Sequence, residues 1–293
     1  MLSTIRYILT GGGLVTRSGR PDYLDSHQVV DKYLLYRSHC TGTMPGCDGL
    51  LFTAIGQSAG ACSDAQLSSF EGEPGQWFRS PDHDCHPLHS ASDISKDMMM
   101  GLALWCSVYK AEKVASRTLR RALLRGGNMG RPWYLISRTL MSPALMYYFF
   151  LCSKKSRKPG LFGRLLLATS HLFPQSGFQA HLQALSMLIL MRIEGGINPI
   201  SMKTLEKLSA ASPQNAMFLA MLDRNNECVS VLTDTSLFPE HSPPTTKNYS
   251  TDYLWQRTPT ENPKDWLPEQ GEDVSIHSGI DFLFASAIYL GMI

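Results

Sequence analysis

The stretch HLQALSMLILMRIEGGINPISMKTLEKLSA, residues 181–210, decides the fold class. Its first half is apolar on nearly every side, as expected of a helix that its neighbours bury. Gly195 and Gly196 follow, and glycine just past the last helical residue is a common helix end. The second half, SMKTLEKLSA, has one apolar and one polar face, which is typical of a surface helix. Together they predict a hairpin of one inner and one outer helix.

The same theme recurs from about residue 94 to residue 293, and SHQVVDKYLLYR (26–37) adds a helix near the start. Its short apolar segments, separated by brief loops, predict a mainly α fold built as a layered array of helical hairpins. An irregular all-α domain is the alternative. Only CVSVLTDTSLF (228–238) favours a strand or short hairpin. The segments are MMMGLALWCSVYK (98–110), EKVASRTLRRALLRGG (112–127), SPALMYYFFLC (142–152), LFGRLLLATSHLF (161–173), SPQNAMFLAML (212–222) and HSGIDFLFASAIYLGMI (277–293).

A chain of 293 residues that is 43% hydrophobic and 18% charged can bury a sizeable core. We predict one domain, 1–293, in which residues 1–46 are an N-terminal extension packed on a helical core, 47–293. The segment 234–277 is rich in Pro, Thr and acidic residues but also carries tryptophans, so we expect a long ordered loop over one end of the helices.

The net charge and the cysteines indicate which partners and which cellular compartment to expect. A net charge of +2, from 27 basic and 25 acidic residues, predicts no nucleic-acid partner. The N-terminus lacks a cleavable signal pattern, and the seven scattered cysteines favour reduced thiols. We therefore expect a cytoplasmic protein. The alternative for the cysteines is a disulfide between Cys40 and Cys47 that closes a small loop. Residues 133–152 resemble a membrane span, but Ser142-Pro143 starts a new helix inside them, so we predict no membrane partner.

Ionisable side chains crowd RSPDHDCHPLHSASDISKDMMMGLALW, residues 79–105, which holds three histidines, one cysteine and four aspartates. Some of these side chains are explained by the start of a helix alone. Ser92 or Ser95 can cap the following helix, and the negative charge of Asp97 is favourable in its first turn. A metal site is a second interpretation, since His, Cys and Asp are metal ligands, but the spacing fits no zinc motif. We therefore predict no metal and no cofactor.

A third interpretation is a cleft, because similar signals precede other apolar helices. Cys47-Asp48, Arg131-Pro132-Trp133 and His277-Ser278-Gly279-Ile280-Asp281 each stand at a junction between a loop and a helix. In an array of hairpins, the same ends of the inner helices converge. Each junction alone is explained by a cap or a structural hydrogen bond, but four of them favour a shared site.

Aspartate-bearing loops that lead into apolar helices, with Trp and Arg in long loops, resemble the complete or incomplete (α/α) toroids of carbohydrate-active enzymes. The resemblance is one of pattern over residues 45–293 and implies a glycan cleft at the loop end of the inner helices. A glycoside hydrolase needs an acid and a base or nucleophile, and a lyase needs a base and a group that neutralises uronate. We assign Asp84, Asp97 and Asp281 as catalytic candidates. The candidates for substrate contact are Asp48, Arg79, His86, Trp255, Arg257 and His277.

Two other functions stay open. A non-enzymatic structural or assembly protein, such as a homo-oligomer subunit, would use the same loops only as caps and would expose an apolar patch. A metal-dependent hydrolase would use His83 and His86 as ligands. The chain has no GxSxG, HExxH or Walker motif. The basic patch Lys154, Lys155, Arg157 and Lys158 is typical of a solvated loop, with contact to phosphate or a membrane surface as its alternative.

Overall fold

The computed structural model describes residues 2–17, 23–40, 42–44, 48–83, 94–130, 140–154, 158–243 and 279–293, with no side-chain description for 23–25. These ranges are mainly helical, and their only β pairing consists of isolated bridges such as Val15 with Ile197. The mainly α class is therefore confirmed. In the described ranges, no helix is both long and apolar enough to cross a lipid bilayer.

The helices follow one another through the chain, joined by turns and loops. They are α1 (Leu2–Thr10), α2 (Tyr23–His39), α3 (Gly49–Ser58), α4 (Lys96–Tyr109), α5 (Glu112–Leu124), α7 (Pro143–Cys152), α8 (Leu161–Ser170), α9 (Phe178–Glu194), α10 (Pro199–Ala211), α11 (Ala216–Met221), α12 (Asn225–Thr233) and α13 (Ile280–Tyr289), with a short 3-10 helix, η1, at Leu67–Phe70.

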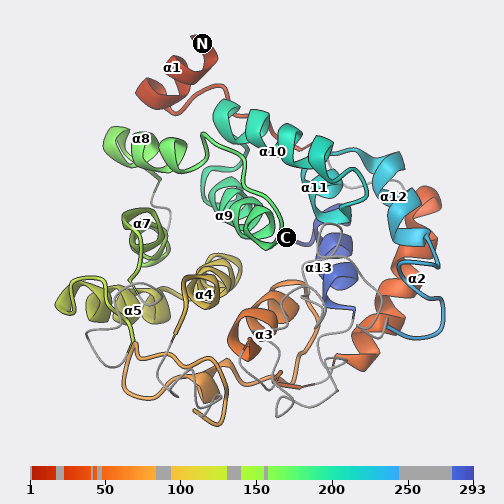
Figure 1. The fold of residues 1–293 in the computed structure, drawn as a ribbon, viewed down its shortest axis with the longest axis horizontal. Coiled ribbons are helices and arrows are strands. Elements are labelled where there is room, and N and C mark those ends of the chain that lie inside the picture. The colour runs from red at the N-terminus through yellow and green to blue at the C-terminus, as the bar shows by residue number, and fades with distance from the viewer. Residues whose placement is uncertain are drawn as a thin grey trace.

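The helices form two layers (Figure 1). An inner group holds α3, α4, α7, α9, α11 and α13, and α5, α8, α10, α12 and α2 lie around it. Consecutive helices contact each other across the layers, as α4 does with α5, α9 with α10 and α11 with α12. A closed toroid is not confirmed by these contacts.

Several helix ends agree with the sequence signals. Gly195 ends α9 in the left-handed region at φ 85°, where glycine meets no Cβ penalty. The Ser142 hydroxyl accepts a hydrogen bond from the Leu145 N–H at 3.2 Å, and Pro143 is the first residue of α7. The segment that resembles a membrane span is thus broken at Ser142, as predicted.

Two local predictions are wrong, and a third, the capping of α4 by Ser92 or Ser95, is not seen for Ser95, while Ser92 lies outside the described residues. Residues 225–233 form α12 rather than a strand, because Cys228 and Leu232, four residues apart, both reach the core. The helix predicted from Ser212-Pro213 starts instead at Ala216, where the Asn215 side chain accepts from the Phe218 N–H at 3.2 Å. Ser95 stands at the N-cap of α4, yet its side chain makes no capping hydrogen bond.

The inner helices α3 and α4 run in the same direction. Near its start, α4 approaches α3 so closely that a Cβ on Gly101 would lie 3.2 Å from Leu51 Cα. Near their ends, the Tyr109 hydroxyl donates to the Gln57 carbonyl at 2.7 Å. The start of α13 lies beside the last turn of α3, since a Cβ on Gly56 would lie 3.2 Å from Ile280 Cδ1. The N-termini of α3 and α4 therefore point to one end of the molecule, and α13 begins at the level where α3 ends.

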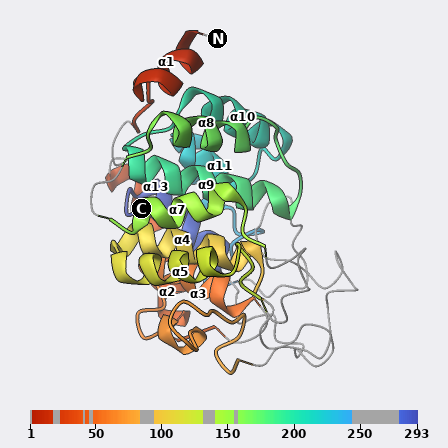
Figure 2. The same ribbon diagram turned by 90° about the vertical axis from the view of Figure 1, so that its left-hand side faces the viewer.

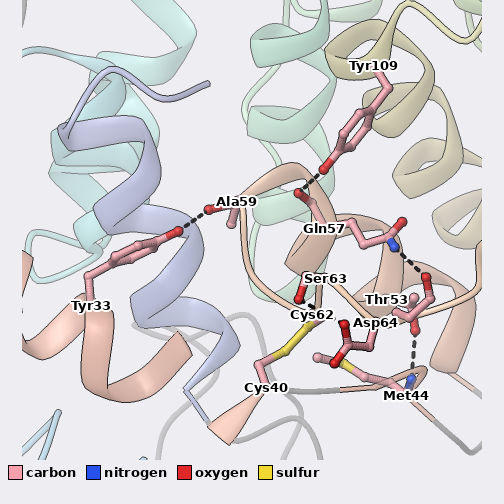
Figure 3. The surroundings of a disulfide bond; sticks show 11 residues. Tyr33, Cys40, Met44, Thr53, Gln57, Ala59, Cys62, Ser63, Asp64 and Tyr109 are labelled. Carbon is pink, nitrogen blue, oxygen red and sulfur yellow. Dashed lines mark hydrogen bonds between the residues drawn. A yellow bond between two sulfur atoms is a disulfide. The ribbon is translucent and has the colours of Figure 1, made fainter. Parts of the chain in front are cut away.

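A disulfide joins Cys40, just after α2, to Cys62, just after α3 (Figure 3). The two Cα atoms are 4.8 Å apart, a distance ordinary for a disulfide. Beside it, the Tyr33 hydroxyl of α2 donates to the Ala59 carbonyl at 2.6 Å. The expectation of reduced thiols is therefore wrong for this pair, and so is the alternative pairing of Cys40 with Cys47. The cysteines no longer argue for the cytoplasm.

Candidate functional site

Asp48 and Arg79 meet at the start of α3. Arg79 Nη2 donates to Asp48 Oδ1 at 2.9 Å, and the two side chains are 29% (Asp48) and 11% (Arg79) exposed. The Arg79 carbonyl also accepts from the Leu50 N–H at 3.1 Å, so this backbone covers the helix start. Asp48 makes no capping hydrogen bond with its side chain. Its carboxylate is therefore held by a cation rather than used as a cap.

Asp97 lies in the first turn of α4 and is half-buried. Gly101 of α4 packs on Leu51 of α3, and the two helices are parallel. Asp97 lies four residues before Gly101, which is about one helical turn, so Asp97 lies beside the start of α3. Asp48 and Asp97 thus stand at the same level of two neighbouring helices. At this level Asp97 could act as an acid or a base beside a substrate contact made by Asp48 and Arg79.

Asp281 lies in the first turn of α13 and is also half-buried. Ile280 packs against Gly56, which is seven residues after the start of α3, so Asp281 is displaced from Asp48 by about 10 Å along the helix axis. Asp48 and Asp97 therefore lie at one end of the helix group, and Asp281 lies near the level of the last turn of α3, so the structure does not bring Asp281 to the other two.

The remaining site candidates lie outside the described residues. They are Asp84, His86, Trp255, Arg257 and His277, together with most of the long loop 234–277. Their assignment stays a prediction.

His83 is the one metal-ligand candidate of the hydrolase hypothesis that the structure describes. Its Nε2 lies 2.8 Å from the Ser69 carbonyl oxygen, and its ring stacks on Phe78 with centroids 4.0 Å apart. In the ranges that are described, no three His, Cys, Asp or Glu side chains gather as a metal site would require. These contacts give His83 a structural role.

Trp77, in the segment between η1 and α4, packs inside the fold and is not available to stack against a sugar ring. It is buried, and its indole N–H donates to the Thr118 hydroxyl of α5 at 2.9 Å. The side chain ties the segment before α4 to α5, which is the ordinary use of a buried tryptophan.

Sequence reasoning missed a cavity of about 410 Å³ at the C-terminal ends of α9 and α13. Arg192 lines it, and in the described part of the chain the guanidinium Nε of Arg192 is buried without a hydrogen-bond partner. Arg17, also in the lining, pairs with Asp223 at 3.1 Å. Gly291 lines the cavity just beyond the end of α13, whereas Asp281 is at the start, so the cavity is separate from the aspartates. Gly195-Gly196 was its only signal in the sequence.

A second missed feature is a buried polar cluster around α9. The Tyr7 hydroxyl lies 2.8 Å from both carboxylate oxygens of Glu194, and burial raises the pKa of Glu194 to about 7. His171 contacts the Ser201 hydroxyl at 2.7 Å and the Ser186 hydroxyl at 2.8 Å, and burial lowers the pKa of His171 to about 4. These groups satisfy one another in the interior, which is a structural role.

Comparison of the chain with known protein families, curated proteins and solved structures gave no match.

Proposed function

We propose that this protein is a polysaccharide-processing enzyme, a glycoside hydrolase or a lyase, built on an incomplete (α/α) toroid. The two layers of paired helices support this proposal, because in such a fold inner helices surround the axis and each is followed or covered by an outer one (Figure 1). In that arrangement α2 covers α13 from outside, although the two are far apart in the chain.

The observation that carries the proposal is the shared level of Asp48 and Asp97 on the parallel helices α3 and α4. Neither the Asp48 nor the Ser95 side chain caps its helix, so the simplest structural explanation does not account for Asp48. Asp97, Asp281 and Asp84 are the proposed acid and base groups, and the pair of Asp48 with Arg79 is the proposed substrate contact. In a lyase, Arg79 would also neutralise a uronate carboxylate.

The test is product release from a panel of neutral and uronate-containing polysaccharides, comparing wild type with Asp84→Asn, Asp97→Asn and Asp281→Asn. An amide keeps the size of the carboxylate but cannot transfer its proton, and loss of general acid or base catalysis typically lowers a rate by about 10²–10⁴-fold. Asp31→Asn, at an exposed position on α2, is the matched control and keeps full activity. No release by wild type from any polysaccharide, or equal rates in all four variants, contradicts the proposal.

A specific observation favours the second candidate, a non-enzymatic structural or assembly protein. Phe162 and Phe173 are 76% and 75% exposed, which a catalytic cleft elsewhere does not require. This function predicts no product and no glycan binding, together with a self-assembled species in light scattering that Phe162→Glu disrupts. The same panel therefore separates the two candidates.

A further inference from the structure

Charge is distributed unevenly along the chain, although its total is close to zero. Between residues 113 and 193 there are thirteen Lys and Arg residues and no Asp or Glu. The rest of the chain holds 14 basic and 25 acidic residues. Arg117 and Arg121 of this segment pair with Glu71 and Glu73 from outside it. The excess of positive charge that remains in the segment predicts attraction to a surface of the opposite sign.

Three helices of this segment build one face of the molecule, while α9 lies inside. Helices α5, α7 and α8 are stacked on the side turned to the viewer in Figure 2, and α7 contacts both of the others. We call this the α5–α8 face. Its exposed large apolar side chains are Leu123, Leu124, Phe150, Leu161, Phe162, Leu165, Leu172 and Phe173.

The apolar exposure on α8 follows the helix geometry. Leu161, Phe162 and Leu165 lie within two turns and form one stripe, while Gly163 and Leu167 are buried on the opposite side. The helix therefore has two apolar faces, of which the core covers only one. A second apolar face turned to solvent on an outer helix needs a partner.

Basic side chains border this stripe. Lys154 and Lys158, in the connection between α7 and α8, are exposed, and Leu161 and Phe162 follow directly. On α5, Lys113 and Arg120 are exposed as well. Large apolar side chains beside Lys and Arg, with no acidic residue between them in the sequence, are the composition of interfacial membrane-binding surfaces.

We propose that the α5–α8 face binds the surface of an anionic lipid bilayer. The Lys and Arg side chains contact phosphate groups of the lipids, and Phe162, Phe173 and the leucines near them enter the boundary between headgroups and acyl chains. This inference is independent of the proposed enzymatic activity.

The chemistry of the face favours an anionic lipid surface over two other partners, nucleic acid and a second copy of this chain. Nucleic acid would satisfy the basic side chains but leave Phe162 and Phe173 in water. A second copy of this chain in a two-fold dimer would cover the apolar side chains but would bring two faces of the same positive charge together. An anionic membrane surface matches both properties.

The experiment is co-sedimentation of the full chain with vesicles of phosphatidylcholine alone or mixed with equal parts of phosphatidylglycerol. We expect binding to the mixed vesicles only, weakened severalfold when NaCl rises from about 0.1 to about 0.5 M, because salt screens the attraction. Replacing Phe162 and Phe173 by Glu, or Lys154 and Lys158 by Glu, should lower binding at least tenfold. Leu34→Glu, at an exposed leucine on α2 away from this face, is the matched control and binds as wild type does.

Salt dependence and lipid preference are measured on wild type, so the test does not depend on the variants folding, and circular dichroism checks those that are used. No binding by wild type, equal binding to both kinds of vesicle, or binding that the Phe162 and Phe173 replacements leave intact would overturn the proposal. Two further results would overturn the proposal. One is a wild-type dimer, detected by light scattering, that does not bind vesicles. The other is tight binding to RNA without binding to vesicles.

Discussion

At the scale of single residues, Glu194 occupies surroundings that disfavour its charge. The Tyr7 hydroxyl donates to its carboxylate, and Arg164 and Lys158 attract it, but burial outweighs these effects and raises its pKa to about 7. A carboxyl group whose pKa is higher in the folded state than in the unfolded state binds its proton more tightly when folded. The stabilising contribution is therefore complete below the unfolded pKa and is lost as the pH rises through about 7.

Glu194→Gln should remove this part of the pH dependence. Between pH 5 and pH 8, the free energy of unfolding of wild type should fall by about 2–3 kcal/mol more than that of the variant, from the difference between the two pKa values. Urea unfolding at the two pH values measures it. Glu206→Gln, at an exposed position on α10, is the control and should follow wild type. Parallel curves for wild type and Glu194→Gln would show that burial does not perturb this carboxyl group.

Residue identities could be read from the sequence better than residue contacts. Asp48 and Arg79 were both predicted at the site, but as separate substrate contacts rather than as an ion pair. Glu194 and Tyr7 were not predicted at all, because they are 187 positions apart in the sequence and no local pattern joins them. Helix periodicity and capping report neighbours within one turn, and both pairs depend on how distant helices pack.

At the scale of elements, the close approach of α3 and α4 sets the level of Asp48 and Asp97. Gly101 makes this approach feasible, since a Cβ there would lie 2.8 Å from Leu51 Cδ1 and 3.2 Å from the Leu51 carbonyl oxygen. The flexible end of Leu51 can move, but its backbone cannot. The distance between the two helices is therefore fixed by a single missing methyl group.

Gly101→Ala should destabilise the protein by about 1–3 kcal/mol through overpacking, even though alanine favours helix more than glycine does. Thermal or urea unfolding measures it, and Ser116→Ala, at an exposed position on α5, should stay close to wild type. An increase in stability for Gly101→Ala would mean that helix propensity outweighs the contact and that α3 and α4 are not tightly packed.

The disulfide links two elements, the end of α2 and the segment after α3. The bond spans 22 residues, so replacing both cysteines by serine should lower the free energy of unfolding by about 3 kcal/mol through the entropy of the unfolded chain. Urea unfolding with and without a reductant tests this: reductant should lower the stability of wild type and leave Cys40→Ser/Cys62→Ser unchanged. If wild type does not respond to reductant, the bond is not formed in solution.

Element ends were predictable where a side chain or a glycine acts locally, as at Ser142 and Gly195. They were not where packing decides. Residues 225–233 have the β-branched residues of a strand, yet Cys228 and Leu232 bury one helical face against the rest of the core. Tertiary contacts override a weak local preference there.

At the scale of the whole molecule, the mainly α class and its pairing into inner and outer helices could be predicted, because apolar and amphipathic segments alternate in the sequence. The positively charged face could not be seen from the total charge of +2, since an acidic remainder cancels it. The sequence does hold the signal, in the long interval from Glu112 to Glu194 without an acidic residue. Charge therefore has to be read along the chain as well as summed.

The contact of α2 with α13 has a consequence for how the chain folds. Tyr36 packs on Phe282 with ring centroids 4.6 Å apart, and Phe238 lies 5.2 Å from the same ring. During synthesis, α2 leaves the ribosome long before α13 exists, so the part of α2 that packs on Phe282 waits for its partner while some 240 residues are added. A contact between such distant parts of the chain makes the last step of folding slow, and the cell must keep the unfinished chain from aggregating until then.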